Sequence, residues 1–291
     1  MRKTEFSPSP TVTVVMNVYK RAANFEIQLD AIRGQTHPVN QILVWENGAQ
    51  SPPPNNVKSF VTSRSTKNLG VWARFAFALN AKTDFVWIID DDTIPGRGWL
   101  ENAIHTFEST PGIIGSRGLR FHSKSSYVLY DEFGPRNPSD QAQEVDIVGH
   151  NWIFPTAWLG EFWSELSNRY PSDLAGEDIH LSYAIGKHLG LGTFVPPHPA
   201  SNTDLWGELP GKTHLDGTDD DAISRDPKSL KKFEEAYRHY IRLGFEPMVS
   251  GKSAQQQIHR YRNRALGAIV SRMPVFAHRL AKLLRFASRR S

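Results

Sequence analysis

Runs of apolar, often β-branched residues alternate with segments of helical spacing through the first ninety residues, and this alternation constrains the fold most. The apolar runs cover residues 11–18, 41–45, 57–62 and 84–89. Between them, residues 22–35 and 70–81 repeat apolar side chains at helical spacing. Strands that are separated by helices form parallel sheets, and continuous apolar runs are typical of strands buried on both faces. The pattern therefore predicts an α/β fold with a mostly parallel central sheet and helices on both faces.

The second half of the chain has a less regular pattern. We expect short strands within 112–121 and 144–149, and helices at 156–167, 177–189 and about 227–243. A loop rich in glycine, proline and aspartate covers 196–221. The interpretation is a flexible N-terminus over residues 1–10, one domain over 11–246, and a separate tail over 247–291.

Composition excludes several classes of site. The 291 residues include no cysteine, which rules out a disulfide framework, a thiolate zinc site and a cysteine nucleophile. The first 20 residues lack the apolar stretch and cleavage site of a secretory signal, so none is expected. The sequence also has no run of 18 apolar residues, and no membrane-spanning helix is expected.

The tail differs from the rest of the chain in charge. Residues 247–291 hold ten of the 34 Lys and Arg residues and no Asp or Glu, although the net charge of the whole chain is only +4. Its apolar residues at helical spacing are Leu266, Ile269, Val270, Met273, Phe276, Leu280, Leu283, Leu284 and Phe286. This pattern predicts a basic amphipathic helix, kinked at Pro274, that lies on an anionic membrane surface. The alternatives are packing on the acidic body and binding of nucleic acid without specificity.

Three consecutive aspartates, Asp90, Asp91 and Asp92, follow the apolar run 84–89. Ligands of parallel sheets bind beyond the carboxyl ends of strands, and adjacent carboxylates there can share a divalent cation with phosphate oxygens. In an extended chain Asp90 and Asp92 point the same way and Asp91 points the other way. The alternative is a cap for a helix that begins near Gly98. One carboxylate would satisfy a cap, so three favour a metal site.

Seven segments, in order along the chain, resemble those of nucleotide-sugar glycosyltransferases with the GT-A fold. They are VVMNVYKR, QILVWENG, KNLG, FVWIIDDDTI, IIGSRGLRF, DIVGHNWIF and GEDIHLSYAI. The closest likeness is to the exostosin-type enzymes of family 64, with the family 2 transferases second. The resemblance spans about residues 11–200. It implies a nucleotide-binding half at about 11–121 and an acceptor half at about 122–246.

The resemblance also implies which side chains bind the nucleotide sugar. They are Tyr19, Arg21, Asn47, Asn68, Arg74, Asp90 and Asp91. Tyr19 and Arg21 would lie near the base, and Arg74 would pair its N–H donors with phosphate oxygens. Glu46 stands where the family has an amide, which leaves Asn47 as the matching residue. A surface turn at Tyr19 and Arg21, and a solvated helix face at Arg74, remain the alternatives.

The implied cofactor is Mn²⁺ or Mg²⁺. Asp92 would ligate the ion as it bridges the diphosphate, with Asp90 beside it and toward the ribose. Some enzymes of this fold use a late histidine as a further ligand, and His214 is the candidate here. An ordinary core or surface histidine is the alternative for His214, as it is for His150, His180 and His198.

A second acidic pair, Glu177 and Asp178, opens the helix predicted at 177–189. Taken alone, the pair is typical of helix capping. The resemblance places it on the acceptor side as the catalytic pair. If the reaction inverts the anomeric centre, Asp178 or Glu177 would remove the acceptor proton. If configuration is retained, Asp178 would stabilise the positive sugar or orient the acceptor.

The predicted function is a metal-dependent glycosyltransferase that moves a hexosyl or N-acetylhexosaminyl group from a UDP-sugar to a glycan or lipid-linked acceptor. The resemblance and the tail together suggest polysaccharide biosynthesis at the cytoplasmic face of a membrane. One alternative is a sugar nucleotidyltransferase, but that class needs a glycine-rich first loop, and TVTVVMNVYKRA has none. A non-catalytic, membrane-bound carbohydrate-binding scaffold is the other alternative.

Overall fold

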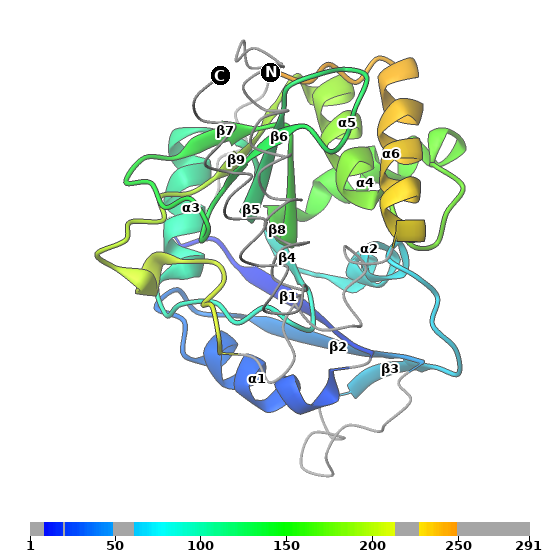
Figure 1. Cartoon of the computed structure of the whole chain (residues 1–291). Coiled ribbons are helices and arrows are strands. Elements are labelled where there is room, and N and C mark those ends of the chain that lie inside the picture. Colours follow the sequence, from blue (N-terminus) through cyan, green and yellow to red (C-terminus); the bar gives the residue numbers. More distant parts are fainter. Residues whose placement is uncertain (1–8, 20, 49–60, 213–226, 249–291) are drawn as a thin grey trace, which may run out of the picture. The chain divides into compact units, whose positions relative to one another are not determined.

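The computed structural model describes residues 9–19, 21–48, 61–212 and 227–248 (Figure 1). In these residues nine strands form one sheet. The strands are β1 (Val12–Val18), β2 (Gln41–Asn47), β3 (Val61–Ser65), β4 (Phe85–Ile89), β5 (Gly112–Phe121), β6 (Tyr130–Phe133), β7 (Gln143–Val145), β8 (Ile147–Pro155) and β9 (Gly192–Val195). The helices are α1 (Phe25–Arg33), α2 (Ala73–Phe77), α3 (Trp99–Ser109), α4 (Leu159–Ser164), α5 (Glu177–Leu189) and α6 (Pro227–Arg242). None of the helices described has the length and apolar character needed to cross a bilayer.

The first half of the sheet has the parallel order that the sequence predicts. Its strands lie in the order β3-β2-β1-β4, and each neighbouring pair is parallel. Helix α1 connects β1 to β2 and α2 connects β3 to β4, and a crossover of this kind returns the chain to the same end of the sheet.

The second half is mixed, which the sequence does not predict. Strand β8 lies between β4 and β5 and is antiparallel to both. Strand β6 pairs with β5, and β7 pairs with β9, each in antiparallel fashion. Only β5 and β9 are parallel in this half. Asp146 separates β7 from β8 without reversing the chain, because β7 is antiparallel to β9, β9 is parallel to β5, and β8 is antiparallel to β5.

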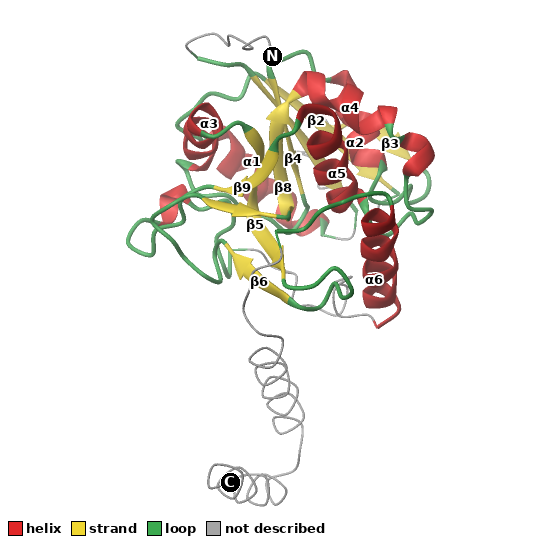
Figure 2. Ribbon diagram, turned by 90° about the horizontal axis from the view of Figure 1, so that it is seen from above, coloured by secondary structure: helices red, strands yellow, loops and turns green. Residues whose placement is uncertain are grey.

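Alternate residues of the central strands face opposite layers of helices. In β4, Phe85, Trp87 and Ile89 pack with α1 and α3 in one core cluster. Val86 and Ile88 pack with α2, α4 and α5 in the other. Figure 2 shows these two groups of helices on opposite sides of the sheet. The continuous apolar run at 84–89 thus reflects a strand that is buried on both faces.

The ends of β1, β2 and β4 meet at one edge of the sheet. Val18 pairs with Glu46 of β2, and Met16 pairs with Ile89 of β4. Residues that follow these strands, including Tyr19 and Asp90, therefore lie close together although they are far apart in sequence.

Most predicted elements are present, with shifted ends. The helix predicted at 70–81 is the short α2 followed by a 3₁₀ turn, and the strand predicted at 144–149 is two strands, β7 and β8. The strand predicted at 57–62 lies largely outside the described residues, and β3 continues to Ser65. His214 and almost all of the tail also lie outside the described residues.

Candidate active site

A cavity of about 490 Å³ opens at the carboxyl edge of the sheet. Ten of the residues predicted for the site line it, from both halves of the chain. They are Tyr19, Arg21, Asn47, Asn68, Arg74, Asp90, Asp91, Asp92, Glu177 and Asp178. The eleventh, His214, is not among the described residues. The structure therefore brings the predicted donor and acceptor residues into one space, while their individual roles stay predictions.

Backbone hydrogen bonds hold the aspartate turn in place. The Asp90 amide donates to the His150 carbonyl over 3.0 Å, and Gln28 Nε2 donates to the Asp90 and Thr93 carbonyls over 2.6 and 2.8 Å. The helix that follows, α3, has Gly98 as its N-cap, with no side-chain cap. The aspartates thus do not cap that helix, and all three line the cavity.

Two arginines partly neutralise the three carboxylates. Arg74 Nη1 pairs with Asp90 Oδ1, and Arg21 Nη1 lies 3.1 Å from Asp91 Oδ1 and 3.6 Å from Asp92 Oδ2. Burial nevertheless raises the pKa of Asp90 to about 6, against the effect of Arg74. Burial, reinforced by Asp92, also raises the pKa of Asp91, against the effect of Arg21. The pKa values of both aspartates are thus raised chiefly because burial disfavours the charged carboxylates, and the arginines offset that effect only in part.

The donor set suits a hard cation that is shared with a ligand. In the described residues no group of three or more His, Asp or Glu side chains is arranged to hold an ion alone. Mg²⁺ and similar ions bind through one or two carboxylates and take their other ligands from substrate phosphates and water. Asp90 and Asp92 fit that pattern, and Asp92 Oδ2 lies 3.6 Å from the Arg21 guanidinium.

Arg74 ties the aspartate turn to the start of α5. Its second nitrogen, Nη2, lies 2.6 Å from Glu177 Oε1, and its guanidinium carbon is 4.5 Å from the centre of the Trp152 ring. The side chain is only 10% exposed. The alternative of a solvated helix face is therefore wrong for Arg74, because its side chain is a buried cation between two carboxylates.

The start of α5 aims Asp178 at the cavity. Gly176 precedes the helix with φ of 103°, a conformation that favours glycine, and no side chain caps the helix. Asp178 Oδ1 accepts a hydrogen bond from the Ile179 amide over 2.7 Å. Burial and the neighbouring Glu177 raise the pKa of Asp178 to about 7. Glu177 is occupied by Arg74, so Asp178 is the member of the pair that can exchange a proton near neutral pH.

The predicted amides order the loop after β3. Asn47 Nδ2 donates to Asn68 Oδ1 over 3.0 Å, and Asn47 Oδ1 accepts from the Leu69 amide over 2.9 Å. Glu46, the residue that departs from the family pattern, pairs with Arg64 Nε at 3.0 Å. Asn17, which the sequence analysis did not single out, also lines the cavity, and its buried Oδ1 has no hydrogen-bond partner among the described residues. A ligand N–H could satisfy that oxygen.

His150 and Arg117 are cavity residues whose place the sequence analysis missed. His150 has φ of 67°, which is uncommon for a residue other than glycine. Its Nδ1 lies 2.8 Å from Glu208 Oε2, and its Nε2 lies 3.0 Å from Arg117 Nη1. Burial alone would lower the pKa of His150, but Glu208 outweighs it and the pKa is raised. Arg117 lies in the motif IIGSRGLRF and His150 lies in DIVGHNWIF, so membership of these motifs could have indicated that both residues line the site.

His180 and His198, the other two described histidines that the sequence analysis names, belong to the core. Burial lowers the pKa of both His180 and His198 to about 4. His180 is held between the Tyr240 hydroxyl and the Phe162 carbonyl at 2.9 and 2.8 Å. For these two residues the alternative of an ordinary core histidine is therefore confirmed.

Part of the cavity lining is an apolar wall that no sequence pattern predicted. Its aromatic residues are Tyr127, Tyr130 and Phe233, joined by Leu119, Leu174 and Leu230. Tyr127 and Phe233 stack with their ring centres 5.7 Å apart. Burial, with a contribution from Asp178, raises the pKa of Tyr127 well above its usual value. The cavity lining thus combines charged and apolar residues.

Residues 13–163 match the model of the family described as Glycosyl transferase family 2. A curated relative, the glycosyltransferase AglE of Haloferax volcanii, is 26% identical over 114 residues, which is 36% of this chain and 38% of the relative. The chain thus spans well under half of that relative's length. A solved mannosyltransferase, PcManGT from Pyrobaculum calidifontis in complex with GDP-Man and Mn²⁺, is 19% identical. That alignment covers 98% of this chain and 82% of the other with a TM-score of 0.49, which supports no inference about ligands.

Proposed function

The chain belongs to glycosyl transferase family 2, and from this membership we propose that it transfers a sugar from a nucleoside diphosphate sugar to a hydroxyl group in the cavity. Family 2 is the second of the two families that the motifs resemble. The predicted GT-A fold is confirmed, and a glycosyltransferase is favoured over the nucleotidyltransferase and scaffold alternatives. The observation that carries the proposal is that Asp90, Asp92 and Asp178 line one cavity.

On the donor side, Asp92 and Asp90 would hold the divalent ion and Arg74 and Arg21 would face the diphosphate. When bound, Mn²⁺ or Mg²⁺ supplies positive charge that stabilises the leaving diphosphate. The arginine N–H groups can donate to phosphate oxygens in pairs. The buried Asn17 oxygen, next to the Tyr19 and Arg21 segment, can accept from a base N–H. UDP is the nucleotide that the motif resemblance implies, and we propose it as the donor.

On the acceptor side, Asp178 would act as the general base. Its raised pKa of about 7 lets the carboxylate take a proton from the attacking hydroxyl near neutral pH. Glu177 and Arg74 would hold the segment in place. Direct attack with proton removal on the far side from the diphosphate inverts the anomeric centre. NMR of the new linkage tests this, and a product with retained configuration would exclude Asp178 as the base of a single displacement.

Replacing Asp92 by asparagine should abolish metal-dependent nucleotide binding while leaving the fold intact. The amide removes the negative charge that an ion needs, but it keeps the size of the side chain. The measurement is isothermal titration with UDP and with GDP, each in Mn²⁺ and in EDTA. We expect the wild type to bind UDP at least ~10-fold more tightly in Mn²⁺, a ratio that corresponds to 1.4 kcal/mol.

Asp140→Asn is the matched control for Asp92→Asn, because Asp140 is exposed and does not line the cavity. The control should bind as the wild type does. Tight, Mn²⁺-dependent binding by Asp92→Asn would contradict the metal-holding role, and tighter binding of GDP than UDP would overturn the proposed base. Nucleotide release from a panel of UDP- and GDP-sugars then identifies the donor sugar.

The basic tail is proposed to hold the enzyme at the cytoplasmic face of an anionic membrane, where a lipid-linked or polysaccharide acceptor is present. The support is its charge and apolar spacing, since these residues lie outside the described ones. The full chain should float with vesicles that contain anionic lipid and not with neutral ones. A chain without residues 255–291 should stay at the bottom of the gradient. Equal flotation of the shortened chain would contradict the proposal.

A further inference from the structure

A second cavity, of about 470 Å³, adjoins the first. The two cavities share Asn68, Gly70 and Leu174. We propose that the second cavity binds the penultimate sugar of an oligosaccharide acceptor whose terminal sugar lies beside Asp178. This inference rests on the proposed function, because it concerns the acceptor of the same reaction.

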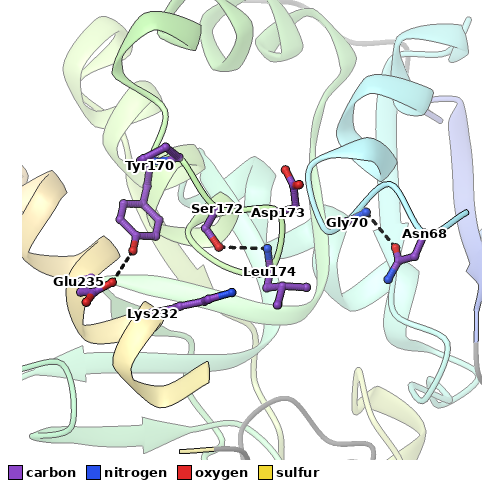
Figure 3. Close-up of a pocket in the computed structure, with 9 residues that line it drawn as sticks. Asn68, Gly70, Tyr170, Ser172, Asp173, Leu174, Lys232 and Glu235 are labelled. Atoms are coloured by element: carbon purple, nitrogen blue, oxygen red, sulfur yellow. Dashed lines mark hydrogen bonds between the residues drawn. The ribbon is translucent and has the colours of Figure 1, made fainter. Parts of the chain in front are cut away.

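The second cavity is built from three segments, as Figure 3 shows: the loop at 68–70, the loop at 170–174 and one side of α6. The two loops are in close contact. The Val71 amide donates to the Asp173 carbonyl over 2.8 Å, and Trp72 Nε1 donates to the Ser172 carbonyl over 2.6 Å. Gly70, with φ of 81°, lies so near that a Cβ atom would stand 2.2 Å from the Asp173 carbonyl oxygen. The wall of the cavity is thus formed before any ligand binds.

Residues of α6 and the 170–174 loop supply the polar groups. The Tyr170 hydroxyl donates to Glu235 over 2.8 Å, and Ser172 Oγ accepts from the Leu174 amide over 3.2 Å (Figure 3). Lys232 also lines the cavity, and no ion pair of Lys232 is present among the described residues. Its ammonium group therefore has N–H donors to offer a ligand.

The mixture of groups fits a neutral, hydroxyl-rich ligand. A sugar hydroxyl both donates and accepts, so it can bond to the Lys232 ammonium and to the carboxylates of Asp173 and Glu235. A phosphate group in this cavity would lie near one cation, Lys232, and two carboxylates, so the net repulsion opposes its binding. The charges of this cavity thus favour a glycan over the phosphate of a lipid-linked acceptor.

The first cavity would hold the terminal sugar of the same acceptor. Its apolar wall beside Asp178 includes the stacked rings of Tyr127 and Phe233, and the C–H face of a sugar ring can pack on such a surface. No hydrogen bond of the Tyr127 hydroxyl is present in the described part of the chain, which leaves it for the ligand. Leu174, 37% exposed, stands where the two cavities meet. A terminal sugar beside Asp178 would therefore extend past Leu174 toward Lys232.

The test uses Lys232→Met, with Lys231→Met as the matched control. Lys231 is the preceding residue, has the same charge, pairs with Glu235 at 3.7 Å, and does not line the cavity. The acceptor probes are p-nitrophenyl glycosides of monosaccharides, the corresponding disaccharides, and farnesyl phosphate. Nucleotide release is measured with the sugar donor that the wild type uses.

We expect the wild type to have a lower KM for disaccharides than for the matching monosaccharides. Lys232→Met should raise the disaccharide KM about tenfold, as for one lost charged hydrogen bond, and leave kcat and the monosaccharide KM unchanged. Lys231→Met should stay within about twofold of the wild type. A change in KM for the longer acceptor alone is a result that a general loss of structure would not produce.

The inference would be overturned if the wild type had equal KM values for monosaccharide and disaccharide acceptors. It would also be overturned if Lys232→Met changed both KM values equally, or if the enzyme used farnesyl phosphate and no glycoside as its acceptor. A panel in which no glycoside accelerates nucleotide release would overturn it as well. Failure of the proposed function itself is distinguished by calorimetry, because it would show as absent nucleotide binding by the wild type.

Discussion

Asparagine in place of Asp178 should lower kcat about 10³-fold while nucleotide binding stays at the wild-type level. The amide keeps the shape of the side chain and its hydrogen bond from the Ile179 amide, but it cannot take a proton from the acceptor. The measurements are product formation in the steady state and isothermal titration with UDP in Mn²⁺. Wild-type turnover by the variant would rule out the assigned role.

The pH profile separates loss of a base from loss of position. A carboxyl whose pKa is about 7 must lose its proton to act, so the wild-type kcat/KM should fall about tenfold for each pH unit below 7. Asp178→Asn should lack this acidic limb and keep only its residual rate. Asp140→Asn again serves as the exposed control and should keep the full profile.

Stability should move in the opposite direction from activity in Asp178→Asn. The pKa of Asp178 is higher in the folded chain than the ordinary 3.8, so the ionised form is disfavoured by folding. The stabilisation that the protonated carboxyl provides is complete below the ordinary pKa and is lost as pH rises through about 7. At pH 8 the neutral amide should therefore raise Tm, by about 3 °C.

Methionine in place of Arg74 should lower the free energy of unfolding by about 3–5 kcal/mol. The guanidinium is buried between Asp90 and Glu177 and lies over Trp152, so its removal leaves two carboxylates without their cation. Urea denaturation at neutral pH measures the loss. Arg97→Met, at an exposed arginine, should change stability by less than about 0.5 kcal/mol.

A second variant checks the cause of that loss. Arg74→Met combined with Glu177→Gln removes one of the uncompensated charges, so the double variant should be more stable than Arg74→Met alone. A double variant that loses the sum of two independent effects would show that packing against Trp152, and not charge, makes Arg74 important. Nucleotide binding should be weak in both variants, because Arg74 also faces the proposed diphosphate site.

The local sequence pattern was sufficient to predict the strands and helices whose burial follows a regular pattern. The run at 84–89 is apolar at every position, and β4 is buried on both faces as such a run requires. The acidic pair after Gly176 marked the start of α5, because glycine and first-turn carboxylates are typical of a helix amino end. The mixed half was missed because β7, β8 and β9 are held by distant partners, as β9 is by Gly112 and Ile113 of β5.

The site residues were also predicted in part from local pattern, and the contacts between them were not. The motifs predicted ten residues that line the cavity, since strand ends of a parallel sheet share an edge. They did not predict which carboxylate each arginine would pair with, nor that Arg74 would pair with Glu177. Those contacts join residues up to 103 positions apart, between Arg74 and Glu177.

By itself the sequence determined that the chain is an α/β protein with a carboxylate turn at the end of a buried strand, because these properties follow from the order of neighbouring residues. Only the tertiary structure decided how the charges pair, which histidine lines the cavity, and that Tyr127 and Phe233 form its apolar wall. The physical reason is that pairing energies and pKa values depend on distance and burial. Both are set when α5, α6 and the sheet pack together, and neither is encoded in any local run of residues.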